Sequence, residues 1–213
     1  KLSEVGYKHT YAQPGIYTVR GHFTFGNGSS PSATLRNVLT TVESLATNSK
    51  SLNSAFRNCA KLTSANISNL AITDLRNAFS GCRTLTDITC NNVDTSKCTS
   101  LRSAFSNCEA LTTLDVNNFS TGNVTDMYGT FMSCLNLSDL DLSNWDTSKV
   151  TSFQYFCMSC TNLASISLGE DFKTDSAENM LGMFYYCQSL TELNTSRWNT
   201  GKVKTMKDMF NGC

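Results

Sequence analysis

The sequence predicts an α/β repeat solenoid, a stack of coils built from short parallel strands and short helices. The first observation is a cysteine that returns at intervals of 23, 26, 26, 26, 27 and 26 residues. The second is that most of these cysteines close an F-x-x-C unit, as in Phe105 to Cys108. The third is that each repeat passes from the alternation of a strand to the apolar spacing of a helix. Because a unit of this length cannot close a core alone, neighbouring units must stack.

The composition narrows the function classes before any motif is considered. Lys and Arg number 17 and so do Asp and Glu, so the chain lacks the basic excess that nucleic-acid binding requires. Hydrophobic residues make up 40% of the chain, which is too many for a disordered protein. No long, continuous apolar stretch occurs, so we expect no membrane span in this chain. The 27 Ser, 27 Thr and 21 Asn residues indicate a surface of neutral polar groups.

Residues 1–31 precede the repeats and alternate apolar and polar residues around Pro14-Gly15. This pattern predicts β structure, either a hairpin that caps the first coil or the end of a separate domain. The string HTYAQPGIYTV resembles the closing strands of a PKD-type β-sandwich. Residues 32–50 follow as an atypical capping unit, because apolar residues recur at helical spacing as far as Leu45. The chain is therefore divided into an N-terminal β segment and a solenoid over 32–213.

Each repeat contains three segments, and residues 137–160 form the fullest copy. An L-x-x-L-x-L opening predicts a short strand that ends near Leu142. A turn-rich N-x-D-T-S-K segment follows, in which we expect the Asp146 carboxylate to accept backbone N–H bonds. In the closing segment, the spacing of Met127 and Phe131 predicts one face of a short helix.

Seven of the ten cysteines share one repeat position, which predicts a cysteine ladder along the coils. The ladder consists of Cys59, Cys82, Cys108, Cys134, Cys160, Cys187 and Cys213. Cys90, Cys98 and Cys157 replace inward-facing apolar residues of other repeats, as small buried hydrophobes do. Parallel Cβ vectors fit a disulfide poorly, so we expect free thiols, with disulfides or a zinc site as the alternatives. Because the last repeat ends with its core uncovered, we also expect the natural protein to continue or another chain to cover this end.

The sequence offers no candidate catalytic residue. It lacks the nucleophile-elbow, P-loop, zinc-protease and dinucleotide-binding motifs. His9 and His22 have no neighbouring nucleophile, and the cysteines are repeated core elements rather than activated thiols. Asp115 and Asp141 share one outward strand position, where a solvated polar face is favoured over a Ca²⁺ site. We therefore expect a protein that is not an enzyme and that binds no cofactor or metal.

A group of Tyr and Met residues on the predicted helical side of the later coils is the candidate binding patch. Earlier repeats carry Arg or Ser at the same positions, as at Arg102 and Ser106. Such a patch is typical of an interface, although partial burial between adjacent coils would also explain it. The candidate residues are Tyr128, Met132, Tyr155, Met158, Tyr185 and Tyr186.

The repeat resembles that of the BspA-like leucine-rich-repeat surface proteins, with the repeat length found in Mycoplasma lipoproteins. The resemblance rests on LDLSNWDTSKVTSF at 140–153 and WNTGKVKTMKDMFNGC at 198–213, and it covers about residues 50–213. It implies a leucine-rich-repeat stack in a protein that is extracellular, attached to a cell surface or displayed on a virion. It also implies a non-enzymatic adhesion or recognition module that binds a protein or glycan receptor. The alternative is a structural module of a larger assembly, such as a phage tail or capsid appendage, which contacts neighbouring subunits.

Overall fold

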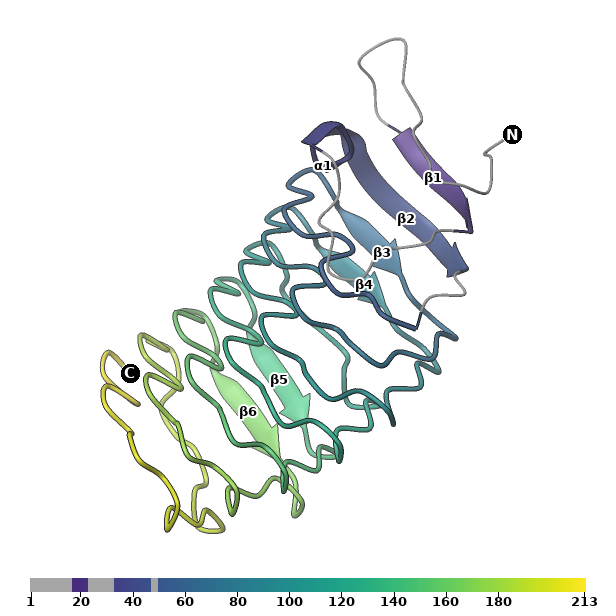
Figure 1. Cartoon of the computed structure of the whole chain (residues 1–213). Coiled ribbons are helices and arrows are strands. Elements are labelled where there is room, and N and C mark those ends of the chain that lie inside the picture. Colours follow the sequence, from purple (N-terminus) through teal and green to yellow (C-terminus); the bar gives the residue numbers. More distant parts are fainter. Residues whose placement is uncertain (1–16, 23–32, 47–49) are drawn as a thin grey trace.

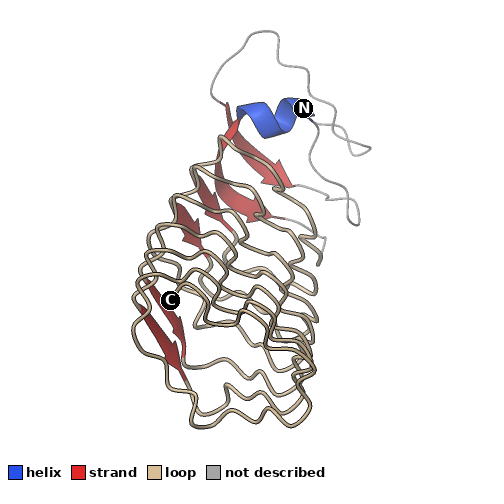
Figure 2. Cartoon of the chain, turned by 90° about the vertical axis from the view of Figure 1, so that its left-hand side faces the viewer, coloured by secondary structure: helices blue, strands red, loops and turns tan. Residues whose placement is uncertain are grey.

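The computed structural model describes residues 17–22, 33–46 and 50–213, and it has the form of a solenoid whose coils stack along one axis (Figure 1). Parallel strands follow one another along this axis, and loops and turns complete each coil (Figure 2). The elements are β1 (Tyr17–His22), α1 (Ala33–Val38), β2 (Leu39–Ala46), β3 (Ser64–Asn66), β4 (Asp87–Thr89), β5 (Asp139–Leu142) and β6 (Ser165–Leu168). The stack confirms the predicted repeat solenoid. No helix in the described part of the chain is long and apolar enough to cross a membrane.

Short parallel strands form where the L-x-x-L-x-L opening predicts them. In β5, Leu140 and Leu142 are buried while Asp139 and Asp141 are exposed, so the strand alternates between core and solvent. β5 pairs with β6 in parallel register, and β1, β2, β3 and β4 form a second sheet in this order. The strand prediction is therefore confirmed for these coils.

The helices predicted for the closing segments are wrong, because these segments form turns. In every coil, the residues five and one positions before the ladder cysteine adopt the left-handed conformation. A positive φ at every fourth position is incompatible with a right-handed α-helix. These left-handed residues are Ser54, Asn58, Asn77, Gly81, Ser103, Asn107, Gly129, Ser133, Tyr155, Ser159, Gly182, Tyr186, Asp208 and Gly212.

Backbone hydrogen bonds between coils take the place of helical bonds in these turns. In the coil that ends at Cys108, every second N–H donates to a carbonyl of the next coil, and the intervening N–H groups close turns within the coil. The inter-coil bonds join Ser103 to Tyr128, Phe105 to Thr130 and Asn107 to Met132, with N···O distances of 2.8, 2.9 and 2.7 Å. Since an α-helix requires each N–H to reach the carbonyl four residues earlier, the two bonding patterns exclude each other.

Aromatic rings stack along the axis inside the core. Four successive coils contribute nearly parallel rings, with centroid separations of 5.2, 5.9 and 5.8 Å. These rings belong to Phe56, Phe79, Phe105 and Phe131. Cys157 takes the Phe position of the following coil, and the ring of Phe156 packs edge-on against Phe131 instead. The stack therefore changes its geometry at this coil without leaving the core open.

In the structure, the cysteines of the ladder are free thiols. Six of its seven thiols donate to a backbone carbonyl of the preceding coil. The accepting residue lies three positions before the ladder cysteine of that preceding coil. The Sγ···O distance is 3.2 Å from Cys134 to Phe105. The Phe105 carbonyl also accepts the N–H of Cys108, so both of its lone pairs are used. This buried position therefore favours a small side chain that carries a donor.

Side chains of the D-T-S-K segment bind the turn and the next coil. The Asp146 carboxylate accepts the N–H of Ser148 at 2.9 Å, and Asp94 accepts an equivalent bond, which confirms the predicted role of Asp146. The neighbouring Thr147 is buried and donates to the carbonyl of Lys173 in the following coil. The same inter-coil bond is made by Thr95, Thr121 and Thr174.

The N-terminal strand β1 belongs to the sheet of the solenoid, because it pairs in parallel with β2. The hairpin predicted around Pro14-Gly15 lies outside the described residues. In the capping unit, α1 ends at Val38, and the helix expected to continue towards Leu45 is replaced by β2. β2 has a strand partner on each edge, so its backbone bonds go to β1 and β3 rather than to a helix.

We predict that Phe105→Ala lowers the free energy of unfolding by about 3–5 kcal/mol, because it leaves a cavity between two stacked rings. The matched control is Phe210→Ala in the last coil, where the residue is 45% exposed and less buried surface is lost. Urea unfolding followed by circular dichroism measures both losses. Equal losses would contradict the role assigned to the Phe stack.

We predict that, in the folded 213-residue chain, a thiol reagent modifies Cys213 first, because the other nine cysteines are buried. In guanidinium chloride, all ten thiols become reactive. The measurement is a spectrophotometric thiol count before and after unfolding. Two thiols missing from the count in denaturant would reveal a disulfide and contradict the free ladder.

Burial raises the pKa of Cys59 to about 12 and the pKa of Cys98 to about 11, from an ordinary value of 9.0. Above this ordinary value, the unfolded chain loses thiol protons that the folded chain keeps, so we predict that the free energy of unfolding falls as the pH rises towards about 11. Cys98→Val introduces the residue found at the equivalent position Val150. We expect this variant to lose stability less steeply, so that the slope of the free energy of unfolding against pH becomes smaller by up to about 1.4 kcal/mol per pH unit. Urea unfolding at a series of alkaline pH values measures the slope, and an unchanged slope in the variant would contradict the prediction.

Candidate functional site

The candidate residues lie on the turns of three successive coils, within 128–132, 155–158 and 185–186. We call them the tyrosine surface, which consists of Tyr128, Met132, Tyr155, Met158, Tyr185 and Tyr186. Tyr186 is 43% exposed, and the other five are half-buried. The tyrosine surface is thus partly accessible and partly buried.

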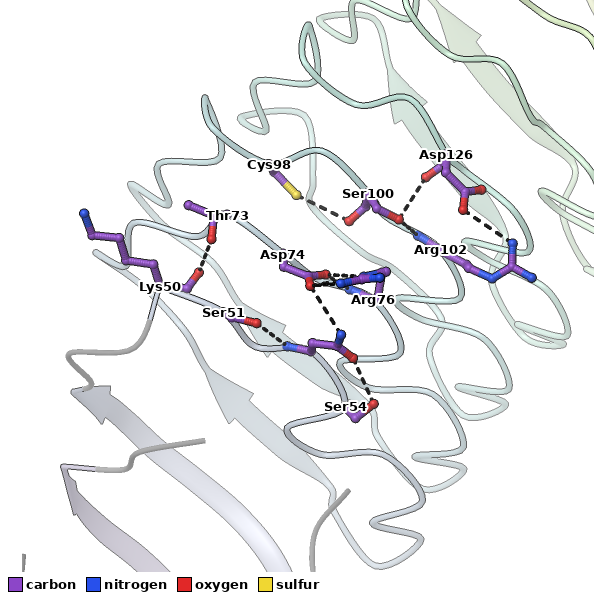
Figure 3. A network of polar contacts seen from close by, with 11 residues as sticks. Lys50, Ser51, Ser54, Thr73, Asp74, Arg76, Cys98, Ser100, Arg102 and Asp126 are labelled. Atoms are coloured by element: carbon purple, nitrogen blue, oxygen red, sulfur yellow. Dashed lines mark hydrogen bonds and ion pairs between the residues drawn. The ribbon is translucent and has the colours of Figure 1, made fainter. Parts of the chain in front are cut away.

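Arg102 extends the tyrosine surface by one coil. Its guanidinium carbon lies 3.9 Å from the ring centroid of Tyr128, a cation–π contact. Asp126 forms an ion pair with Arg102 at 3.4 Å and also accepts the N–H of Tyr128 at 2.9 Å (Figure 3 shows the ion pair). Arg102 and Tyr128 occupy the same repeat position in adjacent coils, and this shared position is the sequence signal from which their contact could have been predicted.

The ion pair of Arg102 differs from that of the preceding coil. Arg76 pairs with Asp74 of its own coil at 2.6 Å, whereas Arg102 reaches the Asp126 of the next coil (Figure 3). The reason is that Ser100 replaces the aspartate at the equivalent position of the Arg102 coil. The serine therefore leaves Arg102 to lie along the axis, over the tyrosine.

Tyr155 lies at the centre of the tyrosine surface. Its ring meets that of Tyr128 edge-on, with a centroid separation of 5.7 Å and an interplanar angle of 77°. On the side of the next coil it lies against Gly182, where an added Cβ would be 2.9 Å from two carbons of the ring. The Cβ of Tyr185 is 3.4 Å from the same point. Gly182 thus provides the space that the Tyr155 ring occupies.

Tyr186 repeats this arrangement one coil later. Its ring contacts that of Tyr185 with a centroid separation of 4.6 Å. A Cβ added to Gly212 would be 3.1 Å from two carbons of the Tyr186 side chain. Tyr155 and Tyr186 therefore each lie against a glycine that occupies the same repeat position of the following coil.

Tyr155 and Tyr186 also adopt an unfavourable backbone conformation. Their φ angles are 57° and 59°, in the left-handed region. All other coils carry Gly, Asn, Ser or Asp at these two positions. A bulky side chain in this region costs about 1 kcal/mol or more, because its Cβ crowds the following carbonyl oxygen. Since the other coils form the same turns with smaller residues, the fold does not require tyrosine at either position.

Neutral polar groups border the tyrosine surface. Asn179 donates an amide hydrogen to Oε1 of Gln154 at 3.0 Å, and Gln154 shares the repeat position of Tyr128 in the following coil. The hydroxyl groups of Tyr128 and Tyr155 form no hydrogen bond with another described residue. The charge of Arg102 is balanced by its ion pair. The surface therefore offers hydroxyl and amide groups. Burial and, as smaller causes, the neighbouring Tyr186 and the Asp208 carboxylate raise the pKa of Tyr185, so one negative charge lies close to the surface.

The strand side holds side chains that close turns. The Asp115 and Asp141 carboxylates each accept the backbone N–H of the second residue that follows, at 3.2 and 2.9 Å. Among the described residues, no group of three or more His, Cys, Asp or Glu is arranged to hold a metal ion. His9 lies outside the described residues, and so does the side chain of His22. Two hollows beside β6 are lined by groups such as Ile166 and Trp198, and neither lining contains Cys or His.

Two solved structures are similar to the chain. A leucine-rich repeat protein of T. pallidum is 20% identical, with 87% of this chain and 92% of that chain covered and a TM-score of 0.43. A leucine-rich cell surface protein of Faecalibacterium prausnitzii is 18% identical, with 83% of this chain and 47% of that chain covered and a TM-score of 0.45. No curated protein sequence matches the chain significantly.

The repeats also match a model of a protein family. The family is described as "Mycoplasma protein of unknown function, DUF285", and its model matches residues 50–167 and again residues 136–213. The two matches overlap and together include the whole cysteine ladder, from Cys59 to Cys213. The chain therefore belongs to the DUF285 family, which confirms the resemblance to BspA-like repeat proteins that the segments 140–153 and 198–213 indicate.

Proposed function

We propose that this chain is a non-enzymatic recognition module, displayed outside the cell, that binds a protein or glycan of a cell surface through the tyrosine surface. The observation that carries the proposal is the left-handed conformation of Tyr155 and Tyr186. Strained residues of this kind occur mainly at functional sites, where the side chain serves a purpose other than folding. A binding role explains why tyrosine stands where small residues suffice for the fold.

The composition of the tyrosine surface supports contact with a partner. Tyr, Met and Arg are enriched in interfaces, and Tyr offers a large contact area with only two side-chain torsions to fix. Arg102 is already held over Tyr128 by its ion pair with Asp126. Inter-coil backbone bonds hold the turns that carry these residues. Little ordering is therefore left to occur on binding, which favours affinity.

The chemistry of the described residues supports binding rather than catalysis. A cysteine nucleophile reacts as the thiolate, and burial raises the pKa of Cys108 and Cys134 well above the ordinary value. The Asp126 and Asp146 carboxylates accept hydrogen bonds from the backbone of their own turns. These groups serve the structure and leave the tyrosine surface as the chemically distinctive part of the molecule.

The proposed location outside the cell follows from the resemblance to the BspA-like repeat proteins, which are surface proteins. A surface rich in Ser, Thr and Asn is compatible with a module that meets solvent along its whole length. The competing proposal, a structural module of a larger assembly, predicts instead that the tyrosine surface is covered by neighbouring subunits.

We predict that the fluorescently labelled chain binds intact cells saturably, and that the double variant Tyr155→Asn with Tyr185→Ser binds at least about tenfold more weakly. The new residues are those at the equivalent positions Asn77 and Ser80, so the turns remain compatible with the fold. Flow cytometry on epithelial cells and on bacteria measures binding, and circular dichroism verifies folding.

The matched control is Asn77→Ser with Arg57→Ser, which changes the same two repeat positions in coils distant from the tyrosine surface. The control should bind like the natural chain. The proposal would be contradicted if the double variant bound cells as tightly as the natural chain does, or if the natural chain bound none of the cell types saturably. Burial of the tyrosine surface between copies in the native assembly would favour the structural alternative.

A further inference from the structure

We infer that the ligand of the tyrosine surface is a neutral, linear oligosaccharide, whose sugar rings stack on Tyr155 and Tyr186. This inference rests on the proposed function and names the chemical class of its ligand. It is carried by three features of the described residues: the way the two rings are supported, their repetition along the axis, and the neutral polar groups around them.

The first feature is the support of each ring by a glycine. Tyr155 lies against Gly182 and Tyr186 against Gly212, in contacts so close that a Cβ on either glycine would reach the tyrosine side chain. Tyr155 also contacts the ring of Tyr128, and Tyr186 contacts the ring of Tyr185, so each ring is held in place before a ligand arrives. The carbon face of a sugar ring carries weakly positive C–H groups, which are attracted to the negative face of an aromatic ring.

The second feature is repetition. Tyr128, Tyr155 and the pair Tyr185 and Tyr186 come from three successive coils, so aromatic rings recur along the solenoid axis. Neighbouring rings touch, with centroid separations of 5.7 Å for Tyr128 to Tyr155 and 4.6 Å for Tyr185 to Tyr186. A ligand that lies along the axis meets rings from one coil after another. A linear polymer of similar units matches this repetition better than the irregular surface of a folded protein.

The third feature is the chemistry around the rings. The tyrosine surface offers the hydroxyl groups of Tyr128 and Tyr155 and, beside them, the amides of Gln154 and Asn179. Such groups both donate and accept hydrogen bonds, as the hydroxyl groups of a sugar do.

The charges favour a neutral sugar over an acidic one. Arg102 contacts the ring of Tyr128, and its guanidinium is already paired with Asp126. The other charge near the tyrosines is the Asp208 carboxylate beside Tyr185, which is negative. A carboxylated or sulfated glycan would have to compete with the Asp126 carboxylate for the arginine. The formal net charge of the chain is zero, so no long-range attraction favours a polyanion.

The test measures binding of the whole chain to immobilised neutral hexasaccharides of the cello, xylo, manno and malto series, with heparin and polysialic acid as anionic counterparts. Biolayer interferometry gives the dissociation constants. We expect saturable binding to at least one neutral series and none to the polyanions. Tyr155→Asn and Tyr186→Asn should each weaken binding about tenfold, the loss of one stacking contact. The melting temperature should stay the same or rise, because asparagine tolerates the left-handed conformation.

The matched control is Asn77→Ser, which alters the repeat position of Tyr155 three coils earlier and should bind like the natural chain. A lower melting temperature with unchanged sugar binding would assign the tyrosines a structural role and overturn the inference. Binding to heparin or polysialic acid alone would also overturn it.

Cells treated with periodate, which destroys sugar diols, separate this inference from the proposed function. Loss of tyrosine-dependent binding to treated cells would support a sugar ligand. Tyrosine-dependent binding that survives periodate would identify a protein partner, so that the sugar inference fails while the proposed function stands. An absence of binding to both cells and sugars would overturn both proposals.

Discussion

Backbone hydrogen bonds between neighbouring coils are the interaction on which the other features of this protein depend. They run through the parallel strand pairs on one side and through every second N–H of the turns on another. Because these bonds fix the spacing of the coils, each buried column can contain only side chains that tolerate a copy of themselves directly above. Flat Phe rings, small thiols and Thr hydroxyl groups satisfy this condition. The same bonds impose two left-handed residues on every coil.

Much of this architecture could be predicted from the sequence, because the repeat itself marks the buried positions. Residues that return in register identify the buried column of ladder cysteines and the Leu pairs of the strands. The helices could not be predicted correctly, because Met127 and Phe131 are buried with the same four-residue spacing in a turn as in a helix. The better signal was the recurrence of Gly, Asn and Ser at the two left-handed positions.

The candidate site could be predicted in membership but not in geometry. Tyr and Met residues that replace Arg and Ser in later coils are visible as a break in the repeat. The shared repeat position of Arg102 and Tyr128 was a signal for their contact, but the glycine beside each tyrosine depends on the path of the turn. The unfavourable φ angles of Tyr155 and Tyr186 are properties of the backbone, and the residue type tyrosine does not indicate them.

The thiol bonds have a direction, since six of the seven ladder cysteines donate to the coil that precedes them. Each coil therefore presents a donor towards one neighbour and an acceptor towards the other, whatever its number in the series. When one whole repeat is duplicated or deleted, the thiol of each coil at the new junction still meets the carbonyl acceptor of its new neighbour. The length of the molecule can thus evolve by unequal recombination, while a surface such as that of the tyrosines is carried along intact from one length to another.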